Sequence, residues 1–134
     1  LYGGGIHSTL NSGFLKMHTD FNWHQRLRLH RRLNVLIYLN KEWDKSWGGE
    51  LELAEMRNGK LCTELSVSPD FNKTVVFTTT DSSFHGHPNP MRLPPGVARN
   101  SIALYYYLSE KPDDDCSEKS TDTKYMFRNG LDFN

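Results

Sequence analysis

One stretch of sequence, residues 33–39, decides the fold class, and it reads LNVLIYL. It is almost wholly apolar and partly β-branched, which is typical of a strand buried in the centre of a sheet. Residues 14–20 and 50–55 alternate between polar and apolar side chains, as a strand with one wet face does. We expect further strands at 60–67, 74–79 and 99–108.

Turn residues separate these strands, and no long window shows helical periodicity with a cap. Asn58-Gly59 between two alternating stretches is a hairpin signal. Many short strands with frequent turns predict an all-β fold, an antiparallel sandwich or barrel.

The length and the charge of the chain limit the number of domains and the classes of partner that we expect. The chain has 134 residues, enough for one compact domain, and its 16 Lys and Arg balance 16 Asp and Glu. Nucleic-acid-binding proteins usually carry a basic excess, so we expect no nucleic-acid partner. The apolar runs are too short to span a bilayer and no secretory leader is visible, so we expect no membrane partner.

Two cysteines, Cys62 and Cys116, are too few for a disulfide framework and predict a reducing compartment, the cytoplasm. We expect Cys62 to be buried and Cys116 to be exposed.

The organisation along the chain predicts a β core at residues 1–108 and a polar tail at 109–134. The tail carries Asp113-Asp114-Asp115 and reads as a mobile tail or surface loop. Three apolar residues could dock its end on the core: Phe127, Leu131 and Phe133.

A metal site is suggested by His18 and Asp20. Residues two apart on a strand share a face, so the imidazole and the carboxylate can converge on one ion. The stretch FHGH at 84–87 offers His85 or His87 as a third ligand. Two histidines and one carboxylate leave coordination positions open, as non-haem Fe(II) oxygen chemistry requires.

An acid-binding pair, Arg99 and Ser101, follows the same spacing at the start of a strand. An inward-facing arginine is costly unless an anion meets it, and its fork binds a carboxylate in bidentate fashion. A metal face beside a carboxylate clamp fits a molecule with an acid at one end and chelating oxygens at the other, and 2-oxoglutarate has that structure.

With these residues in place, the chain resembles the Fe(II)/2-oxoglutarate-dependent dioxygenases of the prolyl 4-hydroxylase-like type. The matching stretches lie within residues 7–108: HTDFN at 18–22, RRLNVLIYLNKEWD at 31–44, WGGELEL at 47–53, FHG at 84–86 and RNSIALYYY at 99–107. The resemblance implies a double-stranded β-helix (jelly roll) with the metal between its two sheets. The sequence begins at Leu1 and not at Met, so the question whether the protein also has N-terminal helical elements stays open.

Carried over residue by residue, the resemblance implies that His18, Asp20 and His85 are the metal ligands. It further implies a cosubstrate site in which Arg99, with Ser101 and Tyr38, binds the remote carboxylate of 2-oxoglutarate and His7 lies near its chelating end. His87 then becomes a rim or surface residue. Arg99 lies farther from His85 than in many relatives, so Arg92 competes for the anchor role, and we interpret the extra residues 88–96 as a surface loop.

The activity implied is hydroxylation of a C–H bond coupled to oxidative decarboxylation of 2-oxoglutarate, with Fe(II), O₂ and ascorbate as a reductant. A prolyl residue in a peptide is the expected substrate, and a small metabolite or sugar is the alternative. Two other classes stay open: a non-catalytic jelly-roll binding module, and a zinc hydrolase built on Asp20, His85 and His87.

The basic segment 24–32 has two interpretations. It is either a solvated loop or a lid that closes over substrates with acidic or phosphate-bearing groups through its arginines, which are Arg26, Arg28, Arg31 and Arg32. As a lid it would place Asn22, Trp23 and His24 at the substrate entrance. We interpret Gly48-Gly49 as a simple turn.

Overall fold

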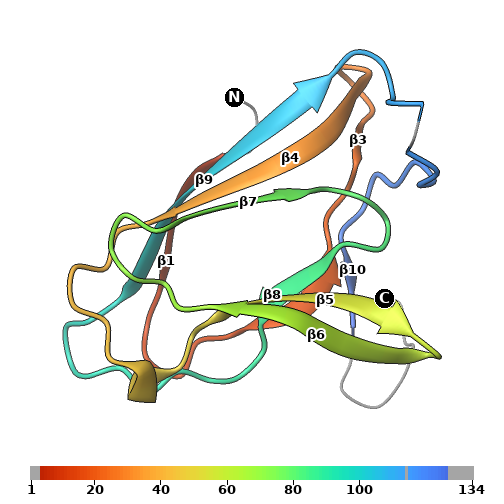
Figure 1. Cartoon of the computed structure of the whole chain (residues 1–134). Coiled ribbons are helices and arrows are strands. Elements are labelled where there is room, and N and C mark those ends of the chain that lie inside the picture. The colour runs from red at the N-terminus through yellow and green to blue at the C-terminus, as the bar shows by residue number, and fades with distance from the viewer. Residues whose placement is uncertain (1–3, 114, 127–134) are drawn as a thin grey trace.

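A computed structural model describes residues 4–113 and 115–126, and within them the chain forms two facing five-stranded sheets (Figure 1). The strands are β1 (Gly5–Thr9), β2 (Leu15–Thr19), β3 (Trp23–His24), β4 (Leu29–Tyr38), β5 (Leu51–Arg57), β6 (Lys60–Val67), β7 (Thr74–Thr78), β8 (Phe84–His87), β9 (Arg99–Leu108) and β10 (Lys124–Tyr125). A short 3₁₀ helix, η1 (Lys45–Trp47), precedes β5. No helix in the described ranges has the length and hydropathy that crossing a bilayer needs.

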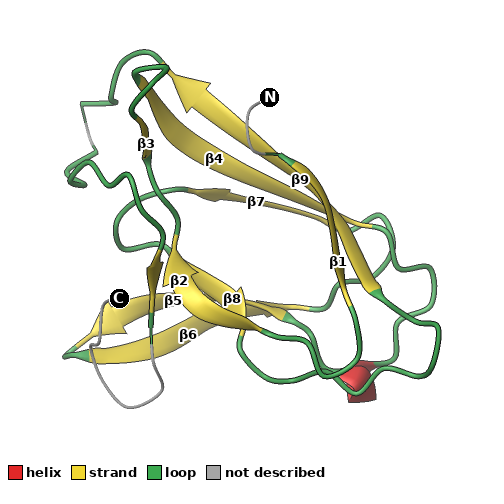
Figure 2. Cartoon of the chain, turned by 180° about the vertical axis from the view of Figure 1, so that it is seen from behind, coloured by secondary structure: helices red, strands yellow, loops and turns green. Residues whose placement is uncertain are grey.

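All named strand pairs are antiparallel. One sheet, which we call the β9 sheet, runs β1-β9-β4-β3, with β7 also paired to β4. The other, the β8 sheet, runs β10-β2-β8-β5-β6. Figure 2 shows the two sheets as separate curled layers that loops join at both ends. This is the predicted all-β fold, a jelly roll.

The strand predictions were accurate for the longer strands. β6 and β9 have the predicted bounds, and the apolar stretch 33–39 lies in β4, which pairs with β7 and β9 on its two sides. β4 begins already at Leu29, so the second half of the predicted basic loop is strand. The short strands β1, β3, β8 and β10 were not predicted, because they carry too few residues for a periodic pattern.

The apolar core is small and split. One cluster joins Met17, Ala54 and Phe84, and another joins Tyr38, Leu51 and Val75. Many of the most buried side chains are polar instead, among them His18, Asn34, His85, His87, Arg99 and Ser101. Because buried polar groups cost free energy unless they are paired, this interior indicates a functional site between the sheets.

The segment 88–96 is not the surface loop that we expected. Met91 is 1% exposed and Leu93 is 6% exposed. The Met91 carbonyl accepts a hydrogen bond from the Ser12 amide at 2.9 Å, and the Met91 amide donates to the Gly13 carbonyl at 3.2 Å. The added length therefore packs into the end of the jelly roll beside the β1–β2 turn.

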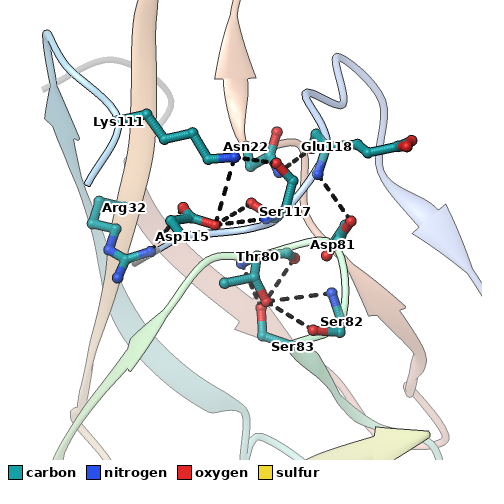
Figure 3. Close-up of polar contacts among 10 residues, drawn as sticks. All are labelled: Asn22, Arg32, Thr80, Asp81, Ser82, Ser83, Lys111, Asp115, Ser117 and Glu118. Carbon is teal, nitrogen blue, oxygen red and sulfur yellow. Dashed lines mark hydrogen bonds and ion pairs between the residues drawn. The ribbon is translucent and has the colours of Figure 1, made fainter. Parts of the chain in front are cut away.

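The polar segment after β9 is bound to the core at several places. We call its residues 111–113 and 115–126 the strap. Asp115 Oδ2 forms an ion pair with Arg32 Nη1 of β4 at 2.9 Å (Figure 3). The Glu118 amide donates a hydrogen bond to Asp81 Oδ2 at 3.1 Å. The strap ends in β10, which pairs with β2 so that Tyr125 lies opposite His18. Phe127, Leu131 and Phe133, for which we predicted docking, lie outside the described residues.

Asn22 is the main attachment of the strap. Its side chain is buried, donates to the Glu118 carbonyl at 2.8 Å and accepts from the Ser120 amide at 2.7 Å.

We expect Asn22→Ala to lower the free energy of unfolding by about 1–3 kcal/mol, because two backbone groups lose their partner. Urea denaturation measures this, and hydrogen exchange should show the protection loss concentrated in the strap. Glu118→Ala is the matched control, since that exposed side chain leaves both backbone bonds intact; an equal loss in both variants would contradict the prediction.

Candidate active site

A cavity of about 410 Å³ lies between the two sheets. Its wall includes residues from β1, β2, β4, β8 and β9, so both sheets contribute to it. Polar groups occupy its two ends, and the apolar side chains of Leu36, Leu51 and Phe77 lie on its wall.

At one end, three predicted metal ligands meet. β2 and β8 pair so that His18 lies directly opposite His85, and Asp20 follows β2 at once. His18 Nε2 is 3.6 Å from Asp20 Oδ1, and His85 Nε2 is 3.3 Å from Asp20 Oδ2. One ligand atom from each residue can be chosen so that all lie within 4.8 Å of one another. Neutral imidazoles and a carboxylate in this arrangement suit a non-haem Fe(II) centre.

Backbone carbonyls orient both imidazoles. His18 Nδ1 lies 2.8 Å from the Lys16 carbonyl, and His85 Nδ1 lies 3.1 Å from the Ser83 carbonyl. A carbonyl can only accept, so Nδ1 of each ring donates to its carbonyl, and Nε2 is the atom of each ring that faces Asp20. Such hydrogen bonds fix the tautomer and the ring orientation of metal-binding histidines.

Arg31 and Asn34 hold Asp20 in place. Arg31 Nη2 donates to Asp20 Oδ2 at 2.7 Å, and Asn34 Nδ2 donates to the same oxygen at 2.8 Å. Burial by itself would raise the Asp20 pKa, but hydrogen bonds from His18 and His85 and the charges of His85 and Arg31 lower that pKa well below its usual range. The carboxylate is therefore ionised, as a metal ligand must be.

Arg31 is the main residue that the sequence analysis missed, since we placed it in a solvated loop or a lid. It is 3% exposed, and its guanidinium carbon lies 3.6 Å from the centre of the Tyr105 ring. Its Nε and Nη2 also donate to Asn34 Oδ1, at 3.0 and 2.7 Å. The signal available in the sequence was Asn34, which shares a strand face with Leu36 and Tyr38 and so points to a polar interior.

We expect Arg31→Met to weaken metal binding by about 10–100-fold, the usual cost of removing a group that orients a ligand. The stem of methionine keeps the packing against Tyr105, but Asp20 Oδ2 loses a charged donor. Calorimetric titration of the metal-free protein with Mn(II) measures this change in metal affinity. Arg26→Met, an exposed position on the β3–β4 turn, is the control and should bind the metal like the wild type. Unchanged affinity in Arg31→Met would remove Arg31 from the site.

At the other end of the cavity lies Arg99. It is 6% exposed, its Nε donates to the Gly49 carbonyl at 2.7 Å, and its Nη2 donates to the Tyr38 hydroxyl at 3.2 Å. No carboxylate in the described ranges forms an ion pair with it. Burial lowers the Arg99 pKa from its usual value, and the nearby Tyr38 and Glu50 oppose that shift. The competing residue, Arg92, is exposed.

Ser101 and His7 lie beside Arg99 on the cavity wall. The β1–β9 register places His7 directly opposite Ser101, and both line the cavity. Tyr38 is fully buried and reaches the site through its hydroxyl, which accepts the Arg99 hydrogen bond. The structure thus brings Arg99, Ser101, Tyr38 and His7 together.

Gly49 does more than form the turn that we predicted. Its φ is +80°, a conformation that favours glycine, and its carbonyl binds Arg99. A Cβ at this position would lie 2.6 Å from Met91 Sδ and 3.3 Å from Arg99 Cδ. The missing side chain therefore lets the backbone approach the guanidinium.

His87 is buried rather than on the surface. It is 5% exposed and lines the cavity, and burial, followed by the charges of Arg99 and His18, lowers its pKa to about 3. Among the described residues it does not belong to the metal-binding group, which contains His85 instead. We predicted a rim or surface position: His87 does line the cavity, but it is buried and not on the surface, because β8 carries both histidines into the space between the sheets.

The predicted entrance residues lie elsewhere. Asn22 holds the strap, and the Trp23 ring packs on His30 at 4.6 Å and under the Lys119 ammonium at 3.9 Å. His24 stacks edge-on against Tyr107 at 6.2 Å. None of these three residues lines the cavity between the sheets.

The two cysteines differ in exposure. Cys62 is half-buried and not buried as we predicted, and Cys116 is exposed as expected.

Comparison with known proteins agrees with this geometry. A family model described as the 2OG-Fe(II) oxygenase superfamily matches residues 4–115. No curated protein matches the chain. The matched region includes both polar ends of the cavity and covers well over half of the sequence. The chain therefore belongs to the 2OG-Fe(II) oxygenase superfamily.

Proposed function

We propose that this oxygenase is a hydroxylase that couples oxidative decarboxylation of 2-oxoglutarate to hydroxylation of a C–H bond. One observation carries the proposal. A buried two-histidine, one-carboxylate group and a buried arginine without a described carboxylate partner lie on the wall of the same cavity. A diacid that chelates a metal with one end and needs a guanidinium at the other matches that arrangement.

In this proposal His18, Asp20 and His85 hold Fe(II). The metal, when bound, supplies the activation of O₂ that amino-acid side chains cannot provide. Arg99 binds the remote carboxylate of 2-oxoglutarate, with Tyr38 fixing the guanidinium and Ser101 and His7 adding hydrogen bonds. The apolar wall of Leu36, Leu51 and Phe77 supports the exclusion of water from the carbon chain between these ends.

For the substrate we propose a prolyl residue in a peptide, as in a prolyl 4-hydroxylase, with a small metabolite or sugar as the alternative. Phe14 and Leu15 line the cavity and are 50% and 37% exposed, which offers an apolar surface to a pyrrolidine ring. Ascorbate is the proposed reductant and the cytoplasm the proposed compartment. The zinc-hydrolase alternative is less well supported, because His87 is not in the metal-binding group.

Metal analysis combined with a succinate-release assay tests the proposal. The protein reconstituted with Fe(II) under nitrogen is supplied with 2-oxoglutarate, O₂ and ascorbate, and then with a panel of prolyl peptides and metabolites. We expect succinate release that rises with the correct substrate and stops in His85→Ala. Iron binding without any succinate would support the binding-module alternative, and tightly held zinc with hydrolytic activity would support the hydrolase.

A further inference from the structure

One polar side chain on the cavity wall has no part in the proposed function, the imidazole of His87. The side chain is 5% exposed, and its Nδ1 has no hydrogen-bond partner in the part of the chain that the structure describes. A buried polar atom without a partner costs free energy, so native structures contain few of them. An apolar residue would avoid this cost. A ligand group in the cavity could supply the partner that this nitrogen lacks.

The strand register locates His87 along the cavity. His85 and His87 share a face of β8, and they lie opposite His18 and Leu15 of β2, respectively. In the facing β9 sheet, Arg99 lies opposite Thr9 of β1. Thr9 and Leu15 are the last residue of β1 and the first of β2, on either side of one short turn. His87 and Arg99 therefore lie at the same end of the cavity, on opposite sheets.

The same cavity wall carries the proposed carboxylate anchor and the proposed metal ligands, so a ligand that fills the cavity can reach His87 as well. Among the described residues, His87 itself does not belong to the metal-binding group.

The ligand chemistry at this end follows from Arg99. A guanidinium without a carboxylate partner attracts an anion, and a carboxylate has more lone pairs than one guanidinium fills. Arg99 already uses Nε for the Gly49 carbonyl and Nη2 for the Tyr38 hydroxyl. A second donor from the opposite sheet would complete the recognition of the acid.

We propose that His87 donates a hydrogen bond to the carboxylate that Arg99 binds, so that both sheets hold the remote acid group of the cosubstrate. This inference rests on the proposed function, since it requires 2-oxoglutarate in the cavity. It makes His87 a specificity residue: it strengthens binding of a 2-oxo diacid and adds nothing for a 2-oxo monoacid of similar chelating chemistry.

The test compares two ligands in the Mn(II)-loaded protein by calorimetry. 2-Oxoglutarate carries the remote carboxylate, and 2-oxobutyrate lacks it. We expect His87→Val to bind 2-oxoglutarate about tenfold more weakly, the value of one hydrogen bond to a charged group, with unchanged affinity for 2-oxobutyrate and Mn(II). His87→Gln, which restores a donor, should recover most of the loss. His87→Phe, which keeps a ring, replaces His87→Val if the latter does not fold.

The outcomes separate the inference from the proposed function. Wild-type affinity for 2-oxoglutarate in the apolar variant would overturn the role of His87 and leave the proposed function intact. An equal loss for both ligands would also overturn it, because the effect would then arise at the metal or from the packing. A wild-type protein that binds Mn(II) but neither acid would overturn the proposed function and the inference with it.

Discussion

Asp20→Ala should weaken metal binding by more than about 100-fold, since removing a group that merely orients a ligand already costs 10–100-fold. Asp20 is the only carboxylate in the metal-binding group of the described chain, and its oxygens lie within 3.6 Å of both imidazoles. Without it, His18 and His85 remain as two neutral ligands, and the charge of Arg31 is left without its carboxylate. We therefore expect loss of both metal affinity and turnover.

Calorimetric titration with Mn(II) and succinate release measure these two effects. Asp81→Ala is a suitable control, because this carboxylate on the β7–β8 turn accepts a hydrogen bond from the Glu118 amide and does not line the cavity. It should keep the metal affinity of the wild type. If Asp20→Ala still bound Mn(II) like the wild type, the metal would have to lie somewhere other than between His18 and His85.

The two halves of the site differ in how well the sequence predicts them. His18 and Asp20 are two residues apart on a strand, and Arg99 and Ser101 repeat that spacing, so strand alternation alone predicts that each pair shares a face. His85 needed the family resemblance, since alternation gives His87 the same face. The structure separates the two by register, because only His85 lies opposite His18.

Arg31 shows why the rest could not be predicted. Counting by twos from Tyr38 through Leu36 and Asn34 excludes residue 31 from the inner face. The β4–β9 register shifts between Arg31 and Leu33, which is a β-bulge, and the shift turns Arg31 inward beside Asn34. The sequence carries no signal for the bulge, and three neighbouring basic residues make a solvated loop the simpler interpretation.

Segment 88–96 and the strap illustrate a second limit of prediction from sequence. Their composition is that of loops, rich in proline or in charge, and composition does not report long-range partners. Met91 is buried by contacts with the β1–β2 turn, and Ser120 is held by Asn22, which is distant in sequence. Hydrogen bonds to backbone groups fix both segments, and such bonds require no particular pattern of side chains.

Arg99→Met should weaken 2-oxoglutarate binding by about 100-fold while leaving Mn(II) affinity unchanged, because the loss is of charge-assisted hydrogen bonds to the remote carboxylate and not of a metal ligand. The long apolar side chain of methionine keeps the volume near Gly49 and Met91. Calorimetry with the Mn(II)-loaded protein separates the two affinities. Arg92→Met is the matched control, since it removes the same charge at an exposed position seven residues earlier in the chain, outside β9.

The comparison of these two arginines decides the orientation of the cosubstrate. If Arg99 anchors the acid, the chelating end must point along the apolar wall of Leu36 and Phe77 toward His18 and Asp20. Weaker binding in Arg92→Met, with Arg99→Met unaffected, would instead place the acid outside the cavity, and the buried guanidinium would then serve only to join Gly49 to Tyr38. That second role leaves a buried charge without an anion, which is a costly arrangement for a purely structural contact. The burial of Arg99 therefore favours the first result.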